Sequence, residues 1–354
     1  MNDGTDLPEA ARIGRVGLRV GDLDRAVDFY TDVVGLSMID DRRDEGRVPE
    51  AVLGAGVEPL LVLQDGSDAP ERSDREAGLF HVAFRVPTRA ALGAALRRLE
   101  DRWRLTGASD HLVSEAIYAR DPAGNGVEIY HDTPRDEWTA REDGGVVIDS
   151  LPLDLEALRV AVTPSDGERG RSADVTDRLP PESDVGHVHL EVTELDRSVA
   201  FYAEAVGLAV RDGTHDGAAF LAAGDYHHHL GLNVWRRRTE PASGGRGLAW
   251  YELVVPESDL GGVRDRLADA GVRITSVDPS EPTEPRKGPV STEHGPFETS
   301  DPDGIRVRFS PERRTTTERQ VAERSERQVA ERSERQGADG KAERSETDEG
   351  VADR

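Results

Sequence analysis

The chain contains no cysteine, only two lysines and no long apolar run. Without cysteine it can form neither disulfides nor thiolate metal sites. No stretch approaches the roughly 18 apolar residues that a membrane-spanning helix requires, and the acidic N-terminal residues do not resemble a signal peptide. We therefore expect a cytoplasmic protein without a membrane partner.

Basic residues are scarce relative to acidic ones. Lysine and arginine number 45 against 70 aspartates and glutamates, which gives a net charge of −25. Such a field repels the phosphates of nucleic acids and anionic membrane surfaces, so neither is expected as a partner. An acidic, lysine-poor composition suits a protein that stays hydrated in concentrated salt, where ions screen the repulsion between carboxylates. We predict a halophilic protein; an acidic, arginine-rich protein without salt adaptation is the alternative.

A segment near the N-terminus is repeated 172 residues later without a gap. Residues 14–36 read GRVGLRVGDLDRAVDFYTDVVGL, and residues 186–208 read GHVHLEVTELDRSVAFYAEAVGL. Each copy begins with alternating apolar residues, which is typical of a strand with one buried face. It continues with apolar residues at the spacing of one helix face and ends at Gly35 or Gly207, which we interpret as helix C-caps.

Two further units begin near residues 78 and 247 with the same alternation, and each ends in an Asp-Pro turn followed by a strand. The sequence therefore predicts an α+β fold of four βαβββ modules paired into two domains, each a curled mixed sheet around a cavity. We expect modules 1 and 2 to form one domain and modules 3 and 4 the other. The predicted boundaries are an N-terminal domain at 12–132, a linker with one packed segment at 133–184, a C-terminal domain at 185–310 and a charged, disordered tail at 311–354.

Strand alternation assigns polar residues of the second module to one face. Val82 and Phe84 should pack on the helix, so that His81 and Arg85 point the other way. In the last strand of this module, Glu128 faces the same side as His81. A sheet that curls places this face toward a cavity. A histidine and a carboxylate on such a surface are two of the three ligands of a facial iron site.

Four segments of the second module and the residues after it resemble the two-domain catechol-2,3-dioxygenase-like proteins of the vicinal oxygen chelate superfamily. They are HVAF (81–84), DHLVSEAIY (110–118), DPAGNGVEIY (121–130) and PRDEW (134–138). This superfamily also contains glyoxalases and bleomycin resistance proteins. The resemblance covers nearly all of residues 12–310. It implies a metal held by a histidine on the first strand of one module, a histidine on the first strand of its partner and a glutamate on a last strand.

The matching positions leave both expected domains with an incomplete ligand set. In the N-terminal domain, His81 and Glu128 fit the pattern, but the third position is Arg15, which cannot ligate a metal. In the C-terminal domain, the resemblance assigns the positions to His187, Trp250 and Arg308. The resemblance to glyoxalases implies an alternative second metal site, with His187 joined by His229 or His227 of the segment YHHHLGLN.

The resemblance also implies roles for other residues. His111 is the candidate acid/base group, and Tyr118, ten residues before Glu128, would hydrogen-bond a substrate oxygen. Arg15 and Arg85 are candidates for binding an anionic substrate, with solvated surface charges as the alternative. For His81 and Glu128 the alternative is a buried hydrogen-bonded pair without metal, and for the histidine cluster it is a polar patch on the cavity wall.

The expected function is Fe(II)-dependent extradiol cleavage of a catechol-type ring by O₂, a reaction of aromatic compound catabolism. The implied partners are a small aromatic substrate and O₂, with Fe(II) as cofactor and Mn, Zn or Ni as alternatives; a homo-oligomer is left open. Two other functions also stay open. One is a non-catalytic small-molecule binding or resistance protein, which the arginine at position 15 favours, and the other is a glyoxalase-like metal-dependent lyase or isomerase.

Overall fold

The computed structural model describes residues 6–43, 48–142, 144–161, 177–277 and 295–312. The predicted tail beyond Glu312 and the middle of the predicted linker, 162–176, lie outside the described residues. None of the helices in the described ranges is long and apolar enough to cross a membrane.

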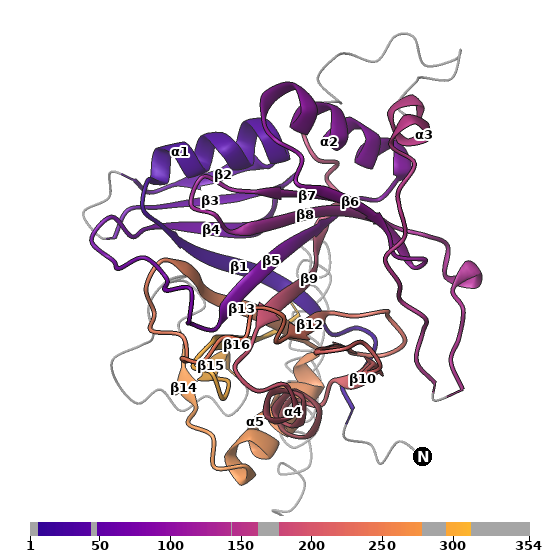
Figure 1. Cartoon of the computed structure of the whole chain (residues 1–354). Coiled ribbons are helices and arrows are strands. Elements are labelled where there is room, and N and C mark those ends of the chain that lie inside the picture. The colour runs from indigo at the N-terminus through magenta and orange to yellow at the C-terminus, as the bar shows by residue number, and fades with distance from the viewer. Residues whose placement is uncertain (1–5, 44–47, 143, 162–176, 278–294, 313–354) are drawn as a thin grey trace, which may run out of the picture. The chain divides into compact units, whose positions relative to one another are not determined.

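The described chain consists of four βαβββ modules, as predicted (Figure 1). Module 1 contains β1 (Arg12–Val20), α1 (Leu23–Asp28), a π-helical turn η1 (Phe29–Val34), β2 (Ser37–Asp41), β3 (Glu50–Ala55) and β4 (Glu58–Asp65). Module 2 contains β5 (Gly78–Arg85), α2 (Arg89–Arg102), β6 (Gly107–Asp110), β7 (Ser114–Arg120) and β8 (Gly126–Asp132). Module 3 contains β9 (Asp184–Glu191), α4 (Leu195–Ala200), η4 (Phe201–Val206), β10 (Ala209–Asp212), β11 (Ala218–Ala222) and β12 (Leu230–Asn233). Module 4 contains β13 (Gly247–Val255), α5 (Glu257–Asp269), β14 (Thr275–Ser276), β15 (Phe297–Ser300) and β16 (Arg306–Pro311).

The repeated segment folds in the same way in both copies. In each, a helix continues into a π-helical turn and ends at a glycine with a left-handed backbone, at φ +96° for Gly35 and +95° for Gly207. A residue with a Cβ is strained in this conformation, so glycine is the fitting C-cap at both positions. The predicted helix ends are confirmed.

The eight strands of each sheet come from modules that are not the expected pairs. One sheet has the order β14-β15-β16-β13-β1-β4-β3-β2, and the other has the order β10-β11-β12-β9-β5-β8-β7-β6. Module 1 therefore shares a sheet with module 4, and module 2 shares one with module 3. The prediction that modules 1 and 2 form one sheet and modules 3 and 4 the other is wrong. Alternation of apolar and polar residues defines the two faces of each strand. It does not define which other module supplies the neighbouring strand in the sheet.

Modules that are neighbours in sequence contact each other through their helices. Figure 1 shows α1 and α2 side by side, and η1 packs on α2. A buried hydrogen bond of 3.1 Å from the Tyr30 hydroxyl to Asp121 joins module 1 to module 2. Its counterpart, from Tyr202 to Asp301 at 2.9 Å, joins module 3 to module 4. Strand pairing and helix packing therefore connect each module to two different partners.

The described part of the predicted linker runs along modules 2 and 3. It contains η2 (Arg135–Glu137) and α3 (Leu155–Val160), and Leu158 of α3 is fully buried in the main core. A separate apolar cluster joins Val146 and Ile148 to Val113 of module 2 and Phe220 of module 3. This stretch thus bridges the two modules of one sheet.

Candidate metal centre

Three polar side chains meet on the cavity-facing side of the sheet formed by modules 2 and 3. His81 comes from β5, Glu128 from β8 on one side of it, and His187 from β9 on the other side. Glu128 and His187 are both register partners of Ala83, whose small side chain separates them in one row across the sheet. His81 lies two residues away on the same face of β5. The alternation of three adjacent strands therefore directs the three side chains to one point.

The ligand atoms are close enough to bind one ion. His81 Nε2 lies 3.0 Å from Glu128 Oε2 and 3.3 Å from His187 Nε2, and His187 Nε2 lies 3.4 Å from Glu128 Oε2. For a metal about 2.1 Å from each ligand atom, neighbouring ligands lie about 3.0 Å apart in octahedral and about 3.4 Å apart in tetrahedral geometry. Within the described residues, this is the group of histidines and carboxylates that could hold a metal ion. The donor set and the spacing fit a divalent cation.

The protonation states of these buried groups also suit metal binding. Burial, together with the neighbouring His187 and His111, lowers the pKa of His81 to about 3, although Glu128 opposes the shift. The imidazole is therefore neutral at pH 7, which leaves a lone pair for a metal. Burial alone would raise the pKa of Glu128, but the neighbouring His187 and His81 hold it below its usual range, so that the group is a carboxylate.

His111 and Tyr118 lie together beside this cluster. His111 Nδ1 lies 2.6 Å from the carbonyl oxygen of Asp149, so Nδ1 carries the proton and donates it. His111 Nε2 then accepts a hydrogen bond of 2.7 Å from the Tyr118 hydroxyl. Burial raises the pKa of Tyr118 well above 10, with Glu128 adding to the shift, so the phenol is protonated. The lone pairs of the Tyr118 oxygen remain for other donors.

A cavity of about 390 Å³ opens over the cluster, within the usual range for small-molecule sites. It is lined by the three clustered residues, by His111 and Tyr118, and by further aromatic side chains that include Phe80, Phe220 and Trp235. His189, which is 3% exposed, also lines it, and its buried Nε2 has no hydrogen-bond partner among the described residues. Buried polar atoms are nearly always hydrogen-bonded, so this nitrogen is available to a group that enters the cavity.

Sequence reasoning missed one cavity residue in the histidine segment and two in the linker. His228 lines the cavity, whereas the expected His227 and His229 do not. The reason is that residues 226–229 form a bend before β12, so strand alternation does not apply to them. From the predicted linker, Ile148 and Ser150 reach the wall. Only the apolar residues of this stretch could have indicated that it packs.

The alternative second metal site is not assembled in the described structure. His187 belongs to the cluster with His81 and Glu128, whereas His229 Nδ1 accepts a hydrogen bond of 3.1 Å from the backbone N–H of Ala223. His227 Nε2 lies 2.9 Å from Asp132 Oδ1. Neither residue contributes to the group that could hold a metal.

The corresponding positions of the other sheet hold no ligands. Arg15 and Arg308 both lie over the ring of the fully buried Trp250, at 5.8 and 4.0 Å from its centroid. Arg15 forms two side-chain hydrogen bonds with Glu252, which lower the pKa of this carboxyl to about 2 although its burial opposes the shift. Arg15 does not line the cavity around His81 and Glu128, so its expected role in substrate binding gains no support here. The third ligand position, which the sequence left without a ligand at Arg15, is filled from another module. His187 occupies that position, because module 2 pairs with module 3.

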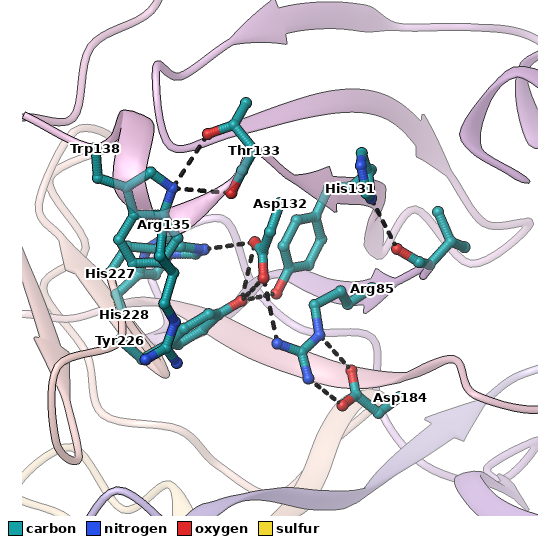
Figure 2. Close-up of polar contacts among 12 residues, drawn as sticks. Arg85, His131, Asp132, Thr133, Arg135, Trp138, Asp184, Tyr226, His227 and His228 are labelled. Atoms are coloured by element: carbon teal, nitrogen blue, oxygen red, sulfur yellow. Dashed lines mark hydrogen bonds and ion pairs between the residues drawn. The ribbon is translucent and has the colours of Figure 1, made fainter. Parts of the chain in front are cut away.

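Arg85 is also engaged away from the cavity. Its guanidinium donates to both oxygens of Asp184 and to Asp132 at 3.2 Å, as Figure 2 shows. It is not among the residues that line the cavity. The structure therefore gives no support to the expected role of Arg85 in substrate binding.

Comparison with known proteins agrees with this architecture. Residues 12–129 and 184–309 match the model of the Glyoxalase/Bleomycin resistance protein/Dioxygenase superfamily. The chain belongs to this superfamily. A catechol-2,3-dioxygenase of Bacillus subtilis is 36% identical to the chain over 286 residues, which cover 78% of this chain and 94% of the relative. The expectation of an extradiol-dioxygenase-like enzyme is confirmed.

Solved structures share the fold. A Bacillus subtilis protein described as a dioxygenase superposes with a TM-score of 0.55 at 15% identity, covering 86% of each chain. Glyoxalase I of Zea mays superposes with a TM-score of 0.52 at 19% identity, covering 85% of this chain and 92% of the other. At these identities the likeness concerns the fold alone, so the chemistry must be argued from the site.

Proposed function

We propose that the chain is an Fe(II)-dependent extradiol dioxygenase that cleaves a catechol-type aromatic ring with O₂. The observation that carries the proposal is the convergence of His81, His187 and Glu128 at the cavity. Two histidines and one carboxylate with open positions are the ligand set of non-haem Fe(II) oxygenases. The similarity to a catechol-2,3-dioxygenase over most of the chain supports the same reaction and substrate class. The same three ligands also bind other divalent metals, so Mn, Zn and Ni are the alternatives to iron.

His81, His187 and Glu128 would hold the metal. When bound, Fe(II) would supply the redox chemistry that allows O₂ to react with an electron-rich ring. The chain itself contributes a cavity with apolar ring faces from Phe80, Phe220 and Trp235. In a site of this kind, apolar walls orient a flat aromatic ring while a few polar groups fix its oxygens.

Polar groups around the cavity would handle the hydroxyl protons of the substrate. Tyr118 donates its own proton to His111, so its oxygen can accept a hydrogen bond from a substrate hydroxyl. His111 is our candidate for the acid/base group, and its Nδ1–H is fixed by Asp149. His228 is a second candidate, because it lines the cavity and its ring lies 4.2 Å from that of His187.

The test is metal analysis of the purified full chain together with catechol-dependent oxygen uptake. We expect about one iron per chain and ring cleavage to a muconic semialdehyde. Replacing Glu128 with Gln should abolish both, because the amide is neutral and ligates poorly. Glu252→Gln is the matched control, since it alters a buried glutamate in the other sheet and should retain the iron. A wild-type protein that lacks metal but binds catechols would overturn the proposal in favour of a binding protein.

Metal-loaded protein that consumes no oxygen but isomerises or cleaves another substrate would instead favour a glyoxalase-like enzyme. The predicted cytoplasmic location and the salt adaptation are separate proposals, since they rest on composition alone.

A further inference from the structure

A chain of hydrogen bonds leads from a half-buried carboxylate, that of Asp132, to the cavity wall. Asp132 Oδ1 lies 2.9 Å from His227 Nε2, and His227 Nδ1 lies 2.7 Å from His228 Nδ1. Figure 2 shows His227 and Tyr226 together on one side of Asp132 and Arg85 on the other. His227 is fully buried, and His228 is the member of the chain that lines the cavity.

The partners of Asp132 hold it as an ionised acceptor. Arg85 donates to Oδ2 at 3.2 Å, and the Tyr226 hydroxyl donates to the carboxylate at 3.1 Å. Tyr226 has one hydroxyl proton, so the Tyr130 hydroxyl, 2.7 Å away, must donate to Tyr226. Burial would raise the pKa of Asp132, but the hydrogen bond and charge interactions with His227 and Arg85 lower it. The carboxylate therefore accepts every hydrogen bond that it forms.

The donors and acceptors around His227 and His228 determine the tautomers of both rings. Because Asp132 only accepts, His227 must donate from Nε2. Burial lowers the pKa of His227, so its ring is neutral, carries no second proton and accepts at Nδ1. His228 must therefore donate from its own Nδ1 to His227. This leaves a lone pair on His228 Nε2, which has no hydrogen-bond partner among the described residues.

We propose that Asp132 is a positioning residue that acts through His227 to fix His228 as the Nδ1–H tautomer, with Nε2 as a hydrogen-bond acceptor for a ligand hydroxyl in the cavity. The part that concerns the ligand rests on the proposed function, whereas the tautomers follow from the hydrogen bonds and from the complete burial of His227, which disfavours a charged ring. The ring of His227 packs against those of Tyr226, at 4.0 Å, and Trp138, at 5.4 Å. Both contacts restrict the orientation of the His227 ring.

Asp132→Asn should reverse the direction of each hydrogen bond between residue 132, His227 and His228. Arg85 can only donate, so the amide oxygen must take the place of Oδ2 and the amide NH₂ must face His227. His227 then accepts at Nε2 and donates from Nδ1, His228 accepts at Nδ1, and its Nε2–H points to the ligand as a donor. In catalytic triads, the same carboxylate-to-amide change imposes the wrong histidine tautomer at a cost of about 10⁴ in kcat.

The experiment is nitrogen NMR of the full chain, labelled with ¹⁵N-histidine and freed of metal by chelation, because the two ring nitrogens report the tautomer directly. We expect Nε2–H for His227 and Nδ1–H for His228 in the wild type, and the reverse pair in Asp132→Asn. Tyr226→Phe is the matched control: it removes another hydrogen bond to the same carboxylate but keeps the ring, so the wild-type tautomers should persist. If Asp132→Asn does not fold, the wild-type spectrum decides, since Nε2–H at His228 overturns the proposal.

Steady-state kinetics with catechol supply the functional readout. Asp132→Asn should lower kcat by about 100-fold or more, with KM changed only a few-fold and iron content unchanged. Replacing Arg85 with Met in the same variant frees the amide to turn its oxygen toward His227, which should restore both the tautomers and much of kcat. The predicted tautomers in a protein without dioxygenase activity would overturn the proposed function and leave the role of Asp132 intact. Wild-type kcat in a variant whose His228 tautomer is reversed would overturn the role of this residue.

Discussion

His187→Ala removes the ligand that comes from the third module. It therefore distinguishes the observed site, which includes His187, from the site expected within residues 12–132 alone. Loss of groups that only orient metal ligands weakens binding about 10–100-fold, so loss of a ligand should cost at least about 100-fold. A metal present at about 100 times its wild-type Kd stabilises the folded protein by about 2.7 kcal/mol. The same concentration should stabilise the His187→Ala variant by at most about 0.4 kcal/mol. At about 2.1 cal/mol/K per residue, the difference corresponds to roughly 3–4 °C in the metal-induced rise of Tm for the unit of residues 1–311.

The assay is a pair of thermal melts, after chelation and after addition of Fe(II) under anaerobic conditions. His229→Ala is the control, because His229 is another buried histidine of the same module, and its Nδ1 accepts a hydrogen bond from the backbone of Ala223. It should keep the full metal-induced rise in Tm although it lowers the baseline. A His187→Ala protein that responds to metal like the wild type would refute the cross-module site.

Three further predictions concern stability. Gly186→Ala should lower the free energy of unfolding by about 1–3 kcal/mol in denaturant titrations, because a Cβ there would lie 1.7 Å from the Tyr130 hydroxyl oxygen; an unchanged midpoint would contradict the close packing. Burial raises the pKa of Asp301 from 3.8 to about 7, so the stabilising contribution of this group is complete below about pH 4 and is lost as the pH rises through 7. Asp301→Asn should therefore flatten the dependence of the free energy of unfolding on pH between these values. An unaltered pH dependence in this variant would be evidence against the shift. The net charge of −25 predicts that Tm rises from about 0.1 to 3 M KCl as carboxylate repulsion is screened, and a flat or falling series would contradict salt adaptation.

Local patterns in the sequence predicted the faces of the strands well. Val82 and Phe84 are buried in the main core, while His81 and Glu128 lie on the opposite, cavity-facing side, as alternation requires. The two-residue period is a property of each strand by itself. It therefore holds whichever module becomes the neighbour.

The identity of that neighbour could not be predicted from the same pattern. Arg15 and His187 occupy equivalent places in the repeat, and either could have joined the strand that carries His81. The choice depends on how four similar modules pack, which involves contacts between residues more than a hundred positions apart. Because module 2 pairs with module 3, the ligands His81, Glu128 and His187 lie close together. Trp250, with Arg15 and Arg308, occupies the equivalent place in the other sheet.

The most direct test of the metal site is an anomalous-scattering map, recorded at the iron edge from crystals of the full chain loaded with Fe(II). The account predicts one peak per chain, about 2.1 Å from His81 Nε2, His187 Nε2 and Glu128 Oε2. A peak elsewhere, such as beside Glu252 in the other sheet, or no peak in protein that retains bound iron, would contradict it.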